Sequence, residues 1–82
     1  MKRTQIISIV NDFLINEIEI DETKLNNDAQ LKNDLGIDSL DFVDIVVIVE
    51  KHFGFKINAD EMVNVITLSQ FYDFIESKIG DR

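Results

Sequence analysis

Ser39 is the side chain of this 82-residue sequence whose neighbours most clearly suggest chemistry. It stands in the segment GIDSLD, residues 36–41, directly before a long apolar stretch. Asp38 is a residue type that caps helix N-termini, and Asp41 three positions later completes a capping pattern. Ser39 would then be the first helical residue, where free backbone N–H groups and the helix dipole favour a negative charge. The spacing therefore predicts a serine that can carry a phosphate ester at the start of a helix.

Catalysis by Ser39 itself is disfavoured, because the sequence offers no evident general base. The only histidine, His52, follows on the same predicted helix, roughly 20 Å away by the α-helical rise. One histidine makes neither a catalytic triad nor a metal site, so we expect His52 to be a solvated surface residue. The chain also has no cysteine, which excludes a disulfide framework, a thiolate metal site and a cysteine nucleophile. We expect a protein that is not an enzyme and has neither catalytic residues nor a metal site.

The element that positions Ser39 is residues 38–53, which contain the run IVVIV at 45–49. β-Branched residues favour strands, but this segment shows no alternation, and no second strand is available to pair with it. On a helix, the apolar residues gather on one face at helical spacing. We therefore predict a helix whose core face consists of Phe42, Ile45, Val46, Val49 and Phe53.

A second apolar stripe remains beside that face, formed by Leu40, Val43 and Val47 and edged by Asp44 and Glu50. Pattern alone leaves two explanations open. A neighbouring helix can cover the stripe, as helical bundles often require. Alternatively, the stripe is an exposed apolar surface rimmed by carboxylates, which is typical of a helix that docks a partner protein.

Three further helical segments are predicted. Residues 4–18 form an amphipathic helix whose apolar face consists of Ile6, Ile7, Val10, Phe13, Leu14 and Ile18. Residues 58–65 begin with a capping pattern and form a short helix that carries Met62 and Val65. A last helix begins at Thr67, carries the stripe Leu68, Phe71, Ile75 and Ile79, and is expected to end at Gly80.

The connection at residues 20–37 has no helical period. A structureless loop of this length is unusual in a compact domain. We therefore expect four apolar residues to pin the connection across a helical bundle, with room for a short helical turn. These anchors are Leu25, Leu31, Leu35 and Ile37.

Size and charge place limits on the whole chain. Its 82 residues, 45% of them hydrophobic, suit a single domain over residues 1–82 with a modest core. A net charge of −8 argues against nucleic acid as a partner. It favours partners with basic docking surfaces, although acidity can also serve solubility alone. No stretch approaches the length of a membrane span and no signal-peptide cleavage pattern follows the N-terminus, so we expect a soluble, cytoplasmic monomer.

The segment DLGIDSLDFVDIVVIVEKHFGFKI, residues 34–57, resembles the modification region of acyl carrier proteins. In that family a DSL serine bears phosphopantetheine, and the resemblance extends over essentially the whole chain. It implies an all-α fold, a four-helix bundle with a long loop between helices 1 and 2 and a short third helix. It also implies that acyl groups are carried as thioesters on the prosthetic thiol, for fatty-acid or polyketide-like biosynthetic enzymes. The missing cysteine fits, because the reactive thiol is then imported.

Transferred to this chain, the resemblance implies that Ser39 is the attachment site. Asp38 would support modification by helping to position metal and cofactor in the phosphopantetheinyl transferase that installs the arm. The partner-docking residues would receive acyl-transferring and condensing enzymes with basic patches, and they are Leu40, Val43, Asp44, Val47 and Glu50. The chain departs from the family where Lys51 and His52 replace common acids and where Asn58 replaces a frequent proline. These departures leave the implied carrier function unchanged and bear on which partner enzymes and which cargo the protein uses.

Other functions share some of these features. A D-alanyl or peptidyl carrier protein uses the same serine chemistry but carries amino acids. A small acidic helical adaptor that binds a partner and is never modified belongs to a different class. A hydrolase that uses Ser39 is disfavoured by the missing base.

Overall fold

The computed structural model describes residues 2–79, and in this part the chain is helical without a strand. The α-helices are α1 (Arg3–Asn16), α2 (Ser39–Phe53) and α3 (Leu68–Ile79). Two single turns of 3-10 helix, η1 (Glu22–Lys24) and η2 (Ala59–Met62), lie in the connections. The all-α prediction is confirmed. Gly80, the expected end of the last helix, lies outside the described residues.

The predicted number of four helices is not confirmed, because the short third helix is only the 3-10 turn η2. Its start follows the prediction, since the backbone N–H of Asn58 donates to the Glu61 carboxylate at 3.3 Å. Beyond it, Val63 and Val65 donate to carbonyl oxygens three residues earlier rather than four. The sequence VNVI at 63–66 has low helix propensity, so nothing local extends the turn into an α-helix.

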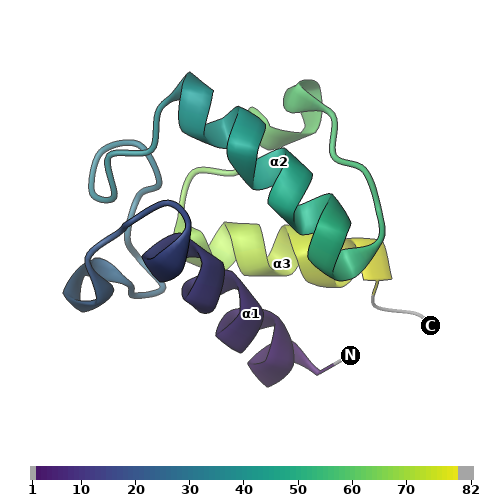
Figure 1. The fold of residues 1–82 in the computed structure, drawn as a ribbon, viewed down its shortest axis with the longest axis horizontal. Helices are drawn as coiled ribbons and strands as arrows, with labels where there is room; N and C mark the ends of the chain where they lie inside the picture. The colour runs from purple at the N-terminus through teal and green to yellow at the C-terminus, as the bar shows by residue number, and fades with distance from the viewer. Residues whose placement is uncertain (1, 80–82) are drawn as a thin grey trace.

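The core forms where the three α-helices meet, and Figure 1 shows α3 between α1 and α2 in this view. Helices α1 and α3 pack directly on each other. The predicted face of α1 supplies four buried residues, Ile6, Val10, Phe13 and Leu14, while Ile7 is partly buried. Ile18 is also partly buried, but it lies beyond α1, which ends at Asn16 and not at residue 18 as predicted. Helix α3 buries Leu68, Phe71 and Ile75 as predicted and adds Tyr72, whereas Ile79 is only partly buried.

The core face predicted for α2 is only partly correct. Ile45 and Val49 are buried, at 1% and 0% exposure. Phe42, Val46 and Phe53 are only partly buried against the core. For Phe42 and Val46 the reason is the shortness of η2, because within residues 2–79 no full α-helix packs along the side of α2 that carries them.

The long connection between α1 and α2 is pinned as expected. Leu31, Leu35 and Ile37 are buried and Leu25 is partly buried, while η1 is the short helical turn. Backbone hydrogen bonds also fix this connection to the start of α3. The N–H of Leu31 donates to the Ile66 carbonyl and the N–H of Leu68 donates to the Ala29 carbonyl, each at 2.9 Å. Residues 29–31 therefore lie beside residues 66–68.

Helix α3 begins at the predicted capping box. The Gln70 N–H donates to the Thr67 hydroxyl at 3.2 Å, and the Thr67 N–H donates to the Gln70 side-chain oxygen at 3.0 Å. Two N–H groups at the helix start thus obtain partners within four residues. The start of α3, and with it the position of residues 63–66, is fixed by local sequence.

Candidate functional site

Ser39 is the first residue of α2 because Asp38 caps this helix. One carboxylate oxygen of Asp38 accepts hydrogen bonds from the backbone N–H groups of Leu40 and Asp41, each at 3.0 Å. The Asp41 carboxylate in turn accepts from the Asp38 N–H at 3.3 Å. The capping box predicted from the sequence is confirmed, and Ser39 is exposed at its predicted position.

The capping geometry corrects the predicted reason for a phosphate at this place. We expected free N–H groups at the helix start to attract an anion. Two of them, those of Leu40 and Asp41, are already bonded to Asp38. What the structure shows at Ser39 is an exposed side chain that this cap holds at a fixed position.

The second apolar stripe of α2 is exposed to solvent. Leu40, Val43 and Val47 are 76%, 63% and 61% exposed, and Asp44 and Glu50 are exposed beside them. No element of residues 2–79 covers the stripe, so a covering helix from this part of the chain is excluded. We call these five residues the docking strip. It begins one residue after Ser39.

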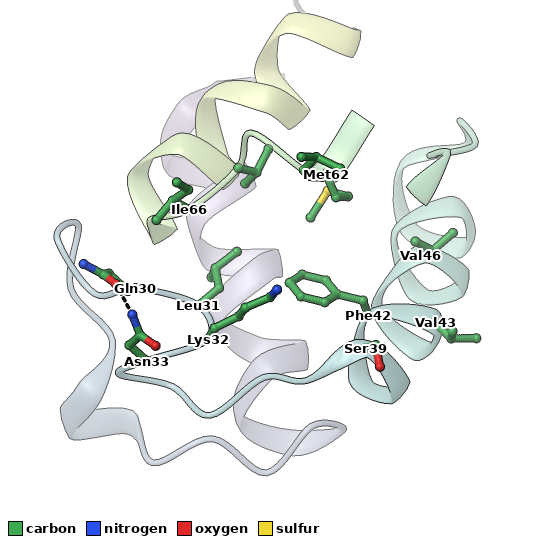
Figure 2. Close-up of a pocket in the computed structure, with 12 residues that line it drawn as sticks. Gln30, Leu31, Lys32, Asn33, Ser39, Phe42, Val43, Val46, Met62 and Ile66 are labelled. Atoms are coloured by element: carbon green, nitrogen blue, oxygen red, sulfur yellow. Dashed lines mark hydrogen bonds between the residues drawn. The ribbon is translucent and has the colours of Figure 1, made fainter. Parts of the chain in front are cut away.

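A pocket of about 740 Å³ opens beside Ser39. Figure 2 shows its three walls, which are the loop at residues 30–33, the first half of α2 and the segment 62–66 that leads to α3. The walls are mainly apolar, and the lining residues from α2 and the later segment are Ser39, Phe42, Val43, Val46, Met62, Val63, Val65 and Ile66. The sequence did not predict this pocket, and its helical pattern placed Phe42 and Val46 in the core.

The loop wall of the pocket differs in character. Leu31 is apolar and buried, but Gln30, Lys32 and Asn33 bring polar groups to the same cavity. The side-chain amide of Asn33 donates to the side-chain oxygen of Gln30 at 2.6 Å, as the dashed line in Figure 2 marks. Val63 and Ile66 were not identified as site residues from the sequence, and they are 73% and 54% exposed. Two β-branched apolar residues beside a short helix were the signal that could have indicated an exposed apolar wall.

His52 lies at the opposite end of α2 from Ser39 and is not in reach as a base. Its side chain is 39% exposed, as a surface residue should be, but it is held against α1. The imidazole stacks on the Phe13 ring with centroids 6.1 Å apart. Its Nε2 lies 3.9 Å from the Glu17 carboxylate. His52 therefore helps to join α1 and α2, which the prediction of a solvated residue did not include.

Two kinds of feature are absent from the part of the chain that the structure describes. It contains no cluster of three or more side chains suited to holding a metal ion. None of its helices has the length and apolar character needed to cross a bilayer.

An ion pair holds the η2 wall of the pocket against α3. The Lys78 ammonium lies 2.8 Å from the Glu61 carboxylate. This hydrogen bond, followed by that from the Asn58 backbone N–H, lowers the pKa of Glu61 below its ordinary value of 4.5. Because the folded pKa is the lower one, ionised Glu61 stabilises the fold above its unfolded pKa, and this stabilisation is lost as pH falls through the folded pKa.

Glu61→Gln should therefore melt at a lower temperature than the unaltered protein at pH 7, and the difference should disappear under acidic conditions below both pKa values. Thermal melts across this pH range measure it. Glu22→Gln, which removes an exposed acid on η1, is the matched control and should leave the midpoint nearly unchanged. This assignment would be contradicted if the difference in thermal midpoint between Glu61→Gln and the unaltered protein stayed constant from pH 7 to acidic pH.

Comparisons with known proteins bear on the whole chain. A family model described as "Phosphopantetheine attachment site" matches residues 6–75. An acyl carrier protein of Thermotoga maritima is 35% identical over 78 residues, covering 95% of this chain and 96% of that protein. One of Cyanophora paradoxa is 42% identical over 67 residues, covering 82% of this chain and 65% of that protein. The protein named acyl carrier protein 2, mitochondrial, of Arabidopsis thaliana is 36% identical over 73 residues, covering 89% and 55%.

Proposed function

Since the chain belongs to the phosphopantetheine-attachment family of acyl carrier proteins, we propose that Ser39 is the residue that bears the phosphopantetheine arm. The protein is a carrier and not an enzyme, and phosphopantetheine is its cofactor. The observation that carries the assignment to Ser39 is its place in GIDSLD as the exposed first residue of α2. Asp38 fixes that place by capping the helix, and we assign it the supporting role in modification.

The test is the intact mass of the chain after incubation with a phosphopantetheinyl transferase and coenzyme A. A carrier gains the mass of one phosphopantetheine group. An unmodified acidic adaptor gains nothing, which is the result that would refute the proposal. Incubating the modified protein with amino-acid-activating or acyl-activating enzymes then separates a D-alanyl or peptidyl carrier from an acyl carrier.

The pocket beside Ser39 is the place that we propose for the cargo. We propose that the acyl chain enters it between α2 and the segment 62–66. Support comes from the apolar side chains on both walls and from Ser39 at the edge of the same cavity. A volume of about 740 Å³ lies within the range of small-ligand pockets. Burying the acyl chain in this pocket removes its apolar surface from water, which is favourable.

The docking strip supports partners with basic surfaces, which we propose to be the transferase and the acyl-transferring and condensing enzymes of a fatty-acid or polyketide-like pathway. Exposed valines and leucine supply apolar contact area, and Asp44 and Glu50 supply charges that steer a basic partner. A cytoplasmic location stays a prediction, since one of the relatives is named as mitochondrial.

Asp44→Arg should slow modification by the transferase about 10-fold to 100-fold in kcat/KM, because reversing a charge at an interface costs roughly 1.4–3 kcal/mol. Folding should hardly change, because exposed substitutions stay within about 0.5 kcal/mol. Initial rates at two salt concentrations measure the first effect and thermal melts the second. Glu22→Arg, an equal change of charge on η1, is the control and should react at the normal rate. Equal loss in both variants would show that net charge, and not the strip, sets the rate.

A further inference from the structure

Lys51 continues the docking strip toward the end of α2. Residues three or four positions apart are neighbours on a helix surface. One row of side chains at this spacing runs along α2, and it consists of Leu40, Asp44, Val47 and Lys51. Lys51 is exposed and lies in the last turn of the helix. The row is therefore negative toward the start of α2 and positive at its far end.

Neither charge in this row is neutralised by the protein. Asp44 and Lys51 belong to no ion pair within residues 2–79. For Lys51 the reason is local, because the residues three and four positions before it on α2, Ile48 and Val47, are apolar. Glu50 does not compensate, since adjacent helical residues point about 100° apart and Glu50 edges Val47 from the other side. Both charges of the row are thus available to a partner.

A partner that covers the apolar part of the strip also reaches Lys51. A stable interface covers about 800 Å² on each partner, a patch roughly 30 Å across. The whole of α2, with 15 residues, spans only about 22 Å, and Asp44 and Lys51 lie about 10 Å apart along its axis. Both charges therefore fall under one such patch.

The positive end of the row conflicts with a docking surface that is basic throughout. Like charges that face each other across an interface weaken it strongly and exclude wrong partners. A carboxylate is the group that complements the Lys51 ammonium, because it accepts a charge-assisted hydrogen bond from it. Asp44 has the opposite requirement and is complemented by a lysine or arginine.

We infer that the phosphopantetheinyl transferase that serves this chain presents an aspartate or glutamate carboxylate to Lys51, in addition to basic residues opposite Asp44. Its docking surface is then basic at one end and acidic at the other, and Lys51 excludes enzymes whose surface is basic at both ends. The inference rests on the proposed function, because it takes the docking strip as the surface that the transferase covers. The competing arrangement gives Lys51 a role in the fold alone, since a cation in the last turn stabilises a helix through its dipole.

The experiment measures kcat/KM for modification of the full chain by the transferase of the same cell, at low and high salt. Lys51→Glu should slow modification about 10-fold at low salt, because it sets two carboxylates against each other. The loss should shrink at high salt, which screens exposed charges. Lys51→Arg keeps the charge and should react at nearly the normal rate. Lys24→Glu, an equal change of charge on η1, is the matched control and should also react normally.

Cross-linking with a carbodiimide, which joins an amine to a carboxylate in contact with it, tests the partner's group directly. In a mixture of the chain and the transferase, Lys51 should become linked to an aspartate or glutamate of the transferase. The exposed Lys24 should not. Mass spectrometry of the digested complex identifies the linked residues.

Four results would overturn the inference while leaving the proposed function intact. An unchanged rate in Lys51→Glu, with only a lower thermal midpoint, would assign Lys51 to helix stability. A faster rate would show a basic surface opposite Lys51. Equal slowing in Lys24→Glu would show an effect of net charge, and a Lys51 without a cross-link to the transferase would show no carboxylate in contact. Failure of the proposed function looks different, because the transferase would then neither bind nor modify the unaltered chain, and the inference would fall with it.

Discussion

Ser39→Ala is expected to abolish modification completely. After incubation with a phosphopantetheinyl transferase and coenzyme A, the variant should keep its unmodified mass, while the unaltered chain gains one phosphopantetheine group. The reason is chemical, because the bond to phosphorus is made by the serine hydroxyl oxygen and alanine has none. The other serines are not expected to substitute, because none of them follows an aspartate as Ser39 does, and they are Ser8, Ser69 and Ser77. The Ser77 hydroxyl also donates to the Phe74 carbonyl in α3.

Two controls make this result specific. Ser8→Ala should be modified at the normal rate, because it removes a serine that is not at a helix start. The thermal midpoint of Ser39→Ala should stay near that of the unaltered protein, since Ser39 is exposed and such substitutions cost at most about 0.5 kcal/mol. A Ser39→Ala variant that still gained the mass would place the arm elsewhere and end the assignment.

Phe71→Ala is expected to have the largest effect on stability. Phe71 on α3 is 1% exposed and belongs to the hydrophobic core. Removing a fully buried phenylalanine ring costs about 3–5 kcal/mol, because a cavity replaces its contacts. Small domains have free energies of unfolding of about 5–15 kcal/mol, so the variant should lose a large part of its free energy of unfolding. Urea unfolding at pH 7 should show the loss, and the thermal midpoint should fall by about 15 °C or more.

Phe42→Ala is the matched comparison, since it removes the same ring from α2. Phe42 is only partly buried and lines the pocket, so its loss should cost roughly 1 kcal/mol. The two variants therefore show how much more a phenylalanine ring contributes to the free energy of unfolding in the core than on the pocket wall. Equal costs for the two variants would show that Phe42 belongs to the core, as helical periodicity alone predicts.

The sequence by itself determined the features that depend on neighbours within one or two helical turns. The cap at Asp38 and Asp41 and the box at Thr67 and Gln70 each join residues three positions apart, so their hydrogen bonds follow from local spacing. The buried face of α1 follows from helical periodicity in the same way. The motif around Ser39 also indicates the family, because GIDSLD and the helix that follows it are contiguous in the chain.

Only the tertiary structure decided how the surfaces of α2 are used. Periodicity placed Phe42 and Val46 on the same face as Ile45 and Val49, but it contains no information on how far a neighbouring element extends. The 3-10 turn η2 ends at Met62, so half of that face borders a pocket while the other half is buried. Val43 in the docking strip stays exposed for the same reason, since no element within residues 2–79 covers it.

The pocket could not be predicted, because its walls come from three separate segments, residues 30–33, 39–46 and 62–66. The loop carrying Lys32 is brought to the segment before α3 by the backbone hydrogen bond between Leu31 and Ile66. Backbone N–H and carbonyl groups are common to nearly all residues, so such a pairing leaves little trace in the side-chain pattern. Chain topology, and not local spacing, therefore places a lysine opposite the apolar wall of α2.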